Sequence, residues 1–203
     1  MLFLIFPVIS VFAQNAADYN KLLKGDFSAF TGYWVNGRND RVYLRPDGTT
    51  YYRGVEANTP KKNGNFYIWN NYDEEYGIAV ILYPVGVDVY GKDSSGKEAV
   101  IKTDKTKVRL FVGEEPTDSN DIYYKESVFP ATHVTTENLK IRTDQNLNAE
   151  TVVIIKKDAK VRVKEWGNNV TIDGKTARWA RVYTSDGFEG WCYSGYLKEL
   201  NTR

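Results

Sequence analysis

The sequence has very few of the residues that build most catalytic and metal centres. Its 203 residues include one cysteine, Cys192, and one histidine, His133. A disulfide within the chain is therefore excluded, and so is a structural zinc site made of four cysteine or histidine ligands. A histidine-dependent hydrolase would have to use His133, which falls in a threonine-rich connector where a catalytic base lacks a rigid partner. We therefore predict a non-enzymatic protein with no cofactor and no metal.

An excess of charge of one sign is also missing. The 27 lysine and arginine residues nearly balance the 26 aspartate and glutamate residues, which leaves a net charge of +1. Proteins that bind nucleic acid or an anionic membrane surface usually carry a clear basic patch or excess. We therefore expect neither of these partners.

The apolar run at the N-terminus is too short to cross a membrane. Residues 1–13 carry no charge and are apolar except for Ser10, whereas a spanning helix needs roughly 20 residues. The run has the length of the apolar part of a signal peptide, and Val11 and Ala13 suit a cleavage site after Ala13. The alternative is a buried terminal strand or helix. We predict a secreted or periplasmic chain without a membrane span after cleavage, although no basic residue precedes the run.

What the sequence does have is an aromatic content of 14%, with fifteen tyrosines. Tyrosine, tryptophan, threonine and valine favour pleated, half-buried strands. After a helical pattern over 15–23, short strand patterns follow one another, with turn signals such as Pro46-Asp47-Gly48 between them. One predicted hairpin joins 98–103 to 107–112 across Asp104-Lys105. The composition and spacing predict an all-β fold with two β-barrel-like modules.

The first module, residues 14–125, combines a short N-terminal helix with such strands. Gly32-Tyr33-Trp34 on its first strand resembles the opening of lipocalin-like small β-barrels, and the resemblance extends over residues 26–125. We expect Trp34 to close the barrel floor as a core residue. The resemblance leaves open an alternative function, in which a small apolar molecule is carried inside the barrel.

Carboxylates offer the other alternative for the first module. Asp73 and Glu75, near Tyr72 and Tyr76, could act as the pair of a carboxylate-based hydrolase. Adjacent loop residues point apart, however, so we favour a solvated turn. A second acidic group does not have the spacing of a calcium-binding loop; its members are Glu114, Glu115, Asp118 and Asp121.

A linker at 126–136 separates this module from a second one at 137–203. The second module resembles the bacterial SH3-like (SH3b) domain over residues 137–200, with the order and spacing of its motifs intact. Thr143-Asp144 and Cys192 depart from the usual pattern, and we expect Cys192 to be a small buried core residue. The matching segments are Leu139-Lys140-Ile141-Arg142, Asp158-Ala159-Lys160-Val161, Trp179–Val182, Gly190-Trp191 and Tyr196-Leu197.

The SH3-like resemblance implies a partly open five-stranded barrel in a protein of the cell envelope. Similar domains accompany peptidoglycan hydrolases and are thought to bind cell-wall peptides. We therefore expect a binding protein whose partners are peptidoglycan peptides or another envelope protein. An aromatic groove would supply the contacts, with Tyr193 and Tyr196 as its most exposed members. Its candidate residues are Trp166, Trp179, Tyr183, Tyr193 and Tyr196.

Overall fold

The computed structural model describes residues 16–50, 56–72 and 77–200, and the predicted signal segment at 1–13 lies outside them. The chain divides after Lys125 into two compact units. The fold is all-β, with two barrel-like modules, as the sequence predicts. Among the described residues, no helix is both long enough and apolar enough to cross a membrane.

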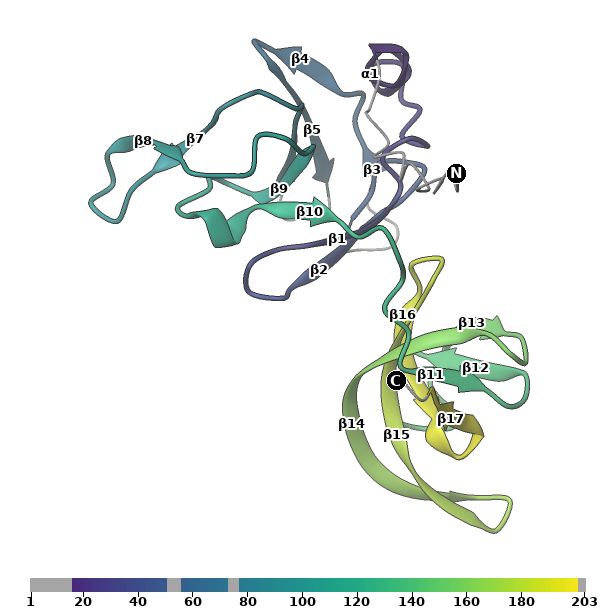
Figure 1. The fold of residues 1–203 in the computed structure, drawn as a ribbon. Coiled ribbons are helices and arrows are strands. Elements are labelled where there is room, and N and C mark those ends of the chain that lie inside the picture. The colour runs from purple at the N-terminus through teal and green to yellow at the C-terminus, as the bar shows by residue number, and fades with distance from the viewer. Residues whose placement is uncertain (1–15, 51–55, 73–76, 201–203) are drawn as a thin grey trace, which may run out of the picture. The chain divides into compact units, whose positions relative to one another are not determined.

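The first unit places one helix beside a large curled sheet (Figure 1). The helix α1 (Ala16–Leu22) confirms the helical pattern expected over 15–23. The sheet has the strand order β2-β1-β10-β9-β6-β5-β3, and β4 also pairs with β5. Its strands are β1 (Gly32–Val35), β2 (Arg41–Leu44), β3 (Glu56–Ala57), β4 (Lys61–Asn63), β5 (Phe66–Tyr72), β6 (Gly77–Tyr83), β9 (Arg109–Gly113) and β10 (Tyr123–Lys125).

Strand β6 is buried on both faces, as its unbroken apolar run predicts. Val80 and Leu82 join one core cluster, whereas Ile81 and Tyr83 join another. The alternation of side chains along a strand explains this division, because neighbours in sequence point to opposite faces. The sheet of the first unit therefore has apolar packing on both sides.

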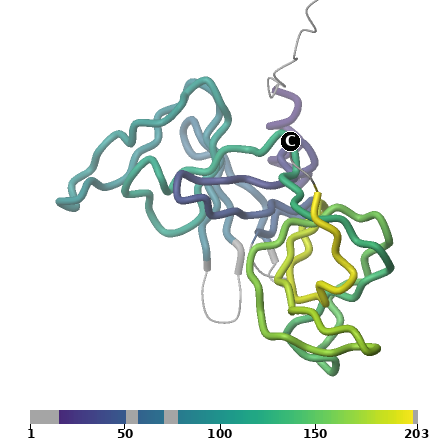
Figure 2. Tube along the Cα trace, turned by 60° about the horizontal axis from the view of Figure 1, so that its bottom comes forward, coloured from purple at the N-terminus to yellow at the C-terminus, as the bar shows by residue number. Residues whose placement is uncertain are grey.

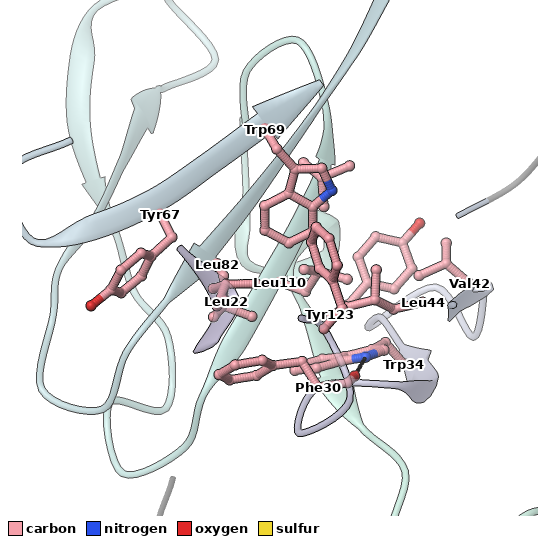
Figure 3. Packing of buried hydrophobic residues seen from close by; sticks show 12 residues of the cluster. Leu22, Phe30, Trp34, Val42, Leu44, Tyr67, Trp69, Leu82, Leu110 and Tyr123 are labelled. Carbon is pink, nitrogen blue, oxygen red and sulfur yellow. Dashed lines mark hydrogen bonds between the residues drawn. The ribbon is translucent and has the colours of Figure 1, made fainter. Parts of the chain in front are cut away.

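The interior of the first unit is filled by large aromatic side chains (Figure 3). Trp34 is fully buried, and its Nε1–H donates a hydrogen bond to the carbonyl oxygen of Phe30 at 3.1 Å. Trp69 is 1% exposed, and its Nε1–H donates to the carbonyl oxygen of Gly48 at 2.9 Å. Trp34 is thus a core residue, as expected. Because these indoles occupy space that an apolar ligand would need, the packing gives the carrier alternative no support.

The strand β8 (Glu98–Ile101) pairs with β7 (Val89–Lys92), so the predicted hairpin across Asp104-Lys105 is wrong. Its second predicted strand instead becomes β9, which pairs with β6 and β10. A turn does form at Asp104, whose carbonyl oxygen accepts from the amide of Lys107 at 3.3 Å. A turn signal fixes where the chain bends, but burial of apolar faces decides which strands pair.

The second unit is a seven-stranded sheet with the order β13-β12-β16-β15-β14-β11-β17 (Figure 1). The strand β12 (Leu139–Arg142) coincides with the predicted one. The other strands are β11 (His133–Thr135), β13 (Thr151–Ile155), β14 (Lys160–Ile172), β15 (Lys175–Thr184), β16 (Glu189–Tyr193) and β17 (Leu197–Glu199). A buried cluster lies in this curled sheet and consists of Leu139, Ile141, Ile155, Val161, Ala180, Val182 and Cys192.

The predicted linker at 126–136 belongs to the second unit. His133 lies in β11, which pairs with both β14 and β17. Thr135 is 1% exposed, and its hydroxyl donates to the carbonyl oxygen of Lys156 at 2.7 Å. The prediction that His133 sits in a loose connector is therefore wrong. The short strand β11 provides backbone hydrogen-bond partners for two neighbouring strands. Because those strands lie far away in the sequence, the residues around His133 carry no pattern that predicts a strand.

The hairpin of β14 and β15 is longer than the sequence pattern indicates. Gly167-Asn168-Asn169 reads as a break, yet β14 continues through it to Ile172. The register shifts between Trp166 and Asn169 and again between Val163 and Glu165. Such bulges bend a strand and increase its twist without ending it. The curved hairpin is clear in both views (Figures 1 and 2).

Candidate functional site

The most exposed aromatic ring of the second unit belongs to Trp166, which is 42% exposed. Its indole contacts the ring of His133 edge-on, with centroids 5.7 Å apart and an angle of 73°. The guanidinium carbon of Arg178 lies 5.7 Å from the centroid of the same indole. We call these three residues the Trp166 platform. They come from β11, β14 and β15.

The bulge in β14 positions Arg178 on the indole. Because the register shifts between Trp166 and Asn169, two carbonyl groups of β14 are available to a side chain from β15. Arg178 donates from Nε to the carbonyl oxygen of Gly167 at 3.1 Å and from Nη2 to that of Trp166 at 3.2 Å. Two directed bonds fix the planar guanidinium, so the cation–π contact does not depend on a freely rotating chain.

His133 contributes an uncharged ring to the Trp166 platform. Its side chain is half-buried, and Nδ1 lies 2.9 Å from the hydroxyl oxygen of Thr132. Burial lowers the pKa of His133, against the opposing effect of the nearby Glu199 carboxylate. The neutral imidazole therefore dominates at pH 7, where it packs against the indole without adding charge.

Of the other predicted groove residues, Trp179 and Tyr193 are core side chains, exposed by 3% and 4%. The hydroxyl of Tyr193 donates to the carbonyl oxygen of Lys175 at 2.6 Å. The prediction that Tyr193 is an exposed member is therefore wrong. The strand that carries it, β16, is buried along nearly its whole length.

Tyr196 and Tyr183 are half-exposed, and each meets a lysine. The ring of Tyr196 packs against Tyr193 at 5.6 Å between centroids, and the ammonium of Lys175 lies 5.7 Å from its centre. The hydroxyl of Tyr183 accepts a hydrogen bond from Nζ of Lys164 at 2.9 Å. The structure thus brings Trp179, Tyr193 and Tyr196 into one neighbourhood, whereas the ring contacts of Trp166 are with His133 and Arg178.

A charged cluster lies beside Tyr183. The Nε of Arg181 lies 2.8 Å from Oε1 of Glu189, and Nζ of Lys164 lies 3.6 Å from the same oxygen. This oxygen is buried and has no well-directed hydrogen bond, so its stabilisation comes from the two cations. Nη1 of Arg181 also lies 3.8 Å from Oε2 of Glu165, so the two cations are balanced by two carboxylates.

Cys192 is a buried core residue, as predicted. Burial raises the pKa of its thiol from 9.0 to about 12. A thiolate is the nucleophilic form, and its population at a given pH falls about tenfold for each pKa unit. The Cys192 side chain therefore contributes to the core packing of the second unit rather than acting as a nucleophile.

We expect Ellman's reagent to modify Cys192 in the folded chain at least about 100-fold more slowly than a cysteine in an unfolded peptide, because both burial and pKa oppose attack. Absorbance at a fixed pH follows the reaction. The same chain in concentrated urea is the control and should react at the peptide rate. Equal rates in both conditions would show that the thiol is accessible.

The acidic residues that the sequence suggested as candidates in the first unit include an ion-paired group and a group outside the described ranges. Arg38 forms ion pairs with Asp118, at 2.8 Å, and with Asp121. Burial opposes ionisation of Asp121, but the amides of Thr117 and Asp118 together with Arg38 bring its pKa down to about 2. In the described part of the chain, no group of three or more histidine, cysteine or carboxylate side chains is placed to hold a metal ion. Asp73, Glu74, Glu75 and Tyr76 lie outside the described residues.

Sequence reasoning missed two members of the Trp166 platform. Arg178 is twelve positions from Trp166, and only the bulged pairing of the long hairpin brings them together. His133 was assigned to the linker. The one local signal was Gly167 beside Trp166. A Cβ at Gly167 would lie 2.1 Å from Oε1 of Gln145, which marks a close approach of two segments.

No curated protein and no solved structure matches this chain. A family model does match it, over residues 8–128, which cover most of the first unit. The family is described as a domain of unknown function, DUF6287. The match spans more than half of the 203 residues. The chain therefore belongs to the DUF6287 family.

Proposed function

We propose that the protein is a secreted or periplasmic, non-enzymatic binding protein of the cell envelope. In this proposal the second unit acts as an SH3-like module that binds peptides or cell-wall ligands. The signal-like segment at 1–13 and the SH3-like motifs between Leu139 and Leu197 support it. The first unit then serves as a lipocalin-like β module that accompanies the binding module.

The observation that carries the proposal is the exposure of Trp166 on a rigid support. An exposed indole leaves a large apolar surface in water, and the side chain is held in place by Arg178 and His133. Large aromatic side chains dominate binding sites because they bury much area and lose little conformational entropy. A prearranged ring reduces the entropic cost of binding further.

The chemistry around the ring suits a peptide that carries a carboxylate. The indole can cover an apolar side chain or a sugar ring, while Arg178, which lies over the ring, adds a positive charge. Peptidoglycan offers short peptides with free carboxylates next to sugars. A single platform of this size fits weak binding, with a dissociation constant of about 1 mM to 1 μM.

We expect the purified chain to sediment with isolated peptidoglycan and the Trp166→Ala variant to lose at least about tenfold in affinity, as for a central aromatic contact. Ile154→Ala is the matched control, because Ile154 is 58% exposed on β13 of the same unit. Its retention should equal that of the original chain. A parallel pulldown from envelope extract tests for a protein partner.

The results separate the possibilities clearly. If the original chain is retained by neither peptidoglycan nor envelope extract, the proposed function is wrong. If it is retained and Trp166→Ala binds equally well, the binding surface lies elsewhere in the chain. Circular dichroism of each variant shows whether the substitution has left the fold intact.

A further inference from the structure

The hairpin of β7 and β8 projects from the first unit as a two-stranded arm (Figures 1 and 2). Its inner face is anchored, because Val89 and Ile101 are buried against Ile81 and Phe111. Its outer face carries two uncovered apolar side chains among charged ones. Tyr90 and Val100 face each other across the two strands and are 64% and 55% exposed. An isolated two-stranded hairpin is marginal in water, and a further strand would stabilise it.

The outer edge of β7 is already occupied. The amide of Lys92 donates to the carbonyl oxygen of Pro116 at 3.1 Å, and Nζ of Lys92 lies 2.8 Å from a carboxylate oxygen of Glu115. A Cβ at Gly91 would lie 2.0 Å from the same carbonyl oxygen, so this segment packs tightly on β7. A further strand would have to add to β8 instead.

The outer edge of β8 presents unpaired backbone groups. The amide of Asp93 donates to the carbonyl oxygen of Lys97 and closes the hairpin. Because antiparallel pairs alternate, Ala99 and Ile101 bond to β7, whereas the backbone groups of Glu98 and Val100 point away from it. Among the described residues, β8 pairs with β7 alone. Such an edge is a template for another strand.

The charges along this edge are complementary to those of a second, antiparallel copy of the same edge. Glu98, Val100 and Lys102 are all exposed and follow one another at every second position. In an antiparallel pair centred on Val100, Glu98 of each copy lies opposite Lys102 of the other. Opposite charges in directly facing positions stabilise a pair of strands, and a two-fold axis forms this contact twice.

We propose that β8 pairs antiparallel with β8 of a second copy of this chain, with Val100 on the two-fold axis, to form a symmetric dimer. The two hairpins then make one four-stranded sheet. On its outer face, Tyr90 and Val100 of both copies form a continuous apolar row. The two-fold charge pattern identifies a second copy, rather than an unrelated strand, as the occupant. This inference does not rest on the proposed function.

Charge reversal tests the dimer. Sedimentation equilibrium of the full chain, over concentrations up to about 1 mM, should show a monomer–dimer equilibrium typical of a small interface. Glu98→Lys and Lys102→Glu each place like charges opposite each other at two sites, and each should weaken the dimer about tenfold or more. An equimolar mixture of the two variants should restore association, because each then meets its complement.

Two further variants distinguish a loss of dimerisation from a loss of folding. The double variant Glu98→Lys with Lys102→Glu should dimerise like the original chain. Val100→Pro removes a donor that points outward and leaves the bonds of Ala99 and Ile101 to β7, so it should abolish dimerisation while the chain stays folded by circular dichroism. Trp166→Ala should dimerise normally, which separates this test from that of the proposed function.

A monomeric original chain at about 1 mM would overturn the proposal, since even weak specific interfaces associate there. So would a dimer that both single charge reversals leave unchanged, or a mixture of the variants that stays monomeric while each is folded. Recovery of association in the mixture would establish that Glu98 and Lys102 face each other across copies.

Discussion

Replacing Trp34 with alanine is expected to cost the first unit about 3–5 kcal/mol of its free energy of unfolding. Trp34 is fully buried in the main core cluster, and its indole N–H bonds to the carbonyl oxygen of Phe30. The substitution removes the largest type of side chain and leaves that carbonyl group without its donor. Since small domains are stable by only about 5–15 kcal/mol, the loss is a large share of the total.

The two compact units make this effect measurable within one molecule. Urea unfolding followed by hydrogen exchange and mass spectrometry assigns each transition to peptides of the first or the second unit. In Trp34→Ala, the unfolding midpoint of the first unit should move to a lower urea concentration, whereas the midpoint of the second unit should not change. Trp166→Ala is the matched control, because it removes the same side chain from an exposed position and should cost less than about 1 kcal/mol. A loss of similar size for both variants would contradict the packing described here.

Strands that carry their own pattern were predictable from the sequence. In Arg41–Leu44 and Leu139–Arg142 apolar and polar residues alternate within four positions, which by itself indicates a strand, and both segments are strands in the structure. The burial of β6 on both faces was predictable from a different local signal, its unbroken apolar run. In each case the sequence pattern that indicates the strand lies within the strand itself, and packing against distant residues agrees with it.

Partner choice was not predictable, because it depends on residues far apart in the sequence. Strand β8 pairs with β7 rather than β9, since this arrangement buries Val89 and Ile101 against the back of the large sheet. Strand β11 has no apolar alternation, yet β14 and β17 both offer it backbone partners. The bulge that brings Arg178 to Trp166 is also invisible in the pattern, since it appears only in the register of two strands.

In the candidate site, too, some features were predictable from the local sequence and others were not. The sequence identified Trp166 as a candidate, but it placed Tyr193 on the surface and His133 in a linker. Burial of β16 on both sides depends on the neighbouring strands and the final turn, and this removed Tyr193 from the surface. An aromatic pattern can therefore identify a β-rich binding module, but exposure within it is a property of the assembled sheet.

Gly190 marks a close approach of two strands in the second unit. A Cβ at Gly190 would lie 2.5 Å from the carbonyl oxygen of Arg142 and 2.7 Å from Cγ2 of Ile141. Both residues belong to β12, which pairs with β16 through Arg142 and Trp191. Glycine before Trp191 thus has a physical reason: without a Cβ, the backbone of β16 can lie close to β12.

We expect Gly190→Ala to destabilise the second unit by about 2–3 kcal/mol, because the φ of 158° adds backbone strain and a backbone carbonyl cannot yield without loss of strand pairing. Gly174→Ala is the matched control. Gly174 has a positive φ of 75° but no atom within 4 Å of an added Cβ, so only backbone strain of about 1 kcal/mol applies. The measurement is the urea midpoint of the second unit, with the first unit as internal reference. If Gly174→Ala proves the more costly of the two, backbone conformation rather than the contact between β12 and β16 limits the stability of this unit.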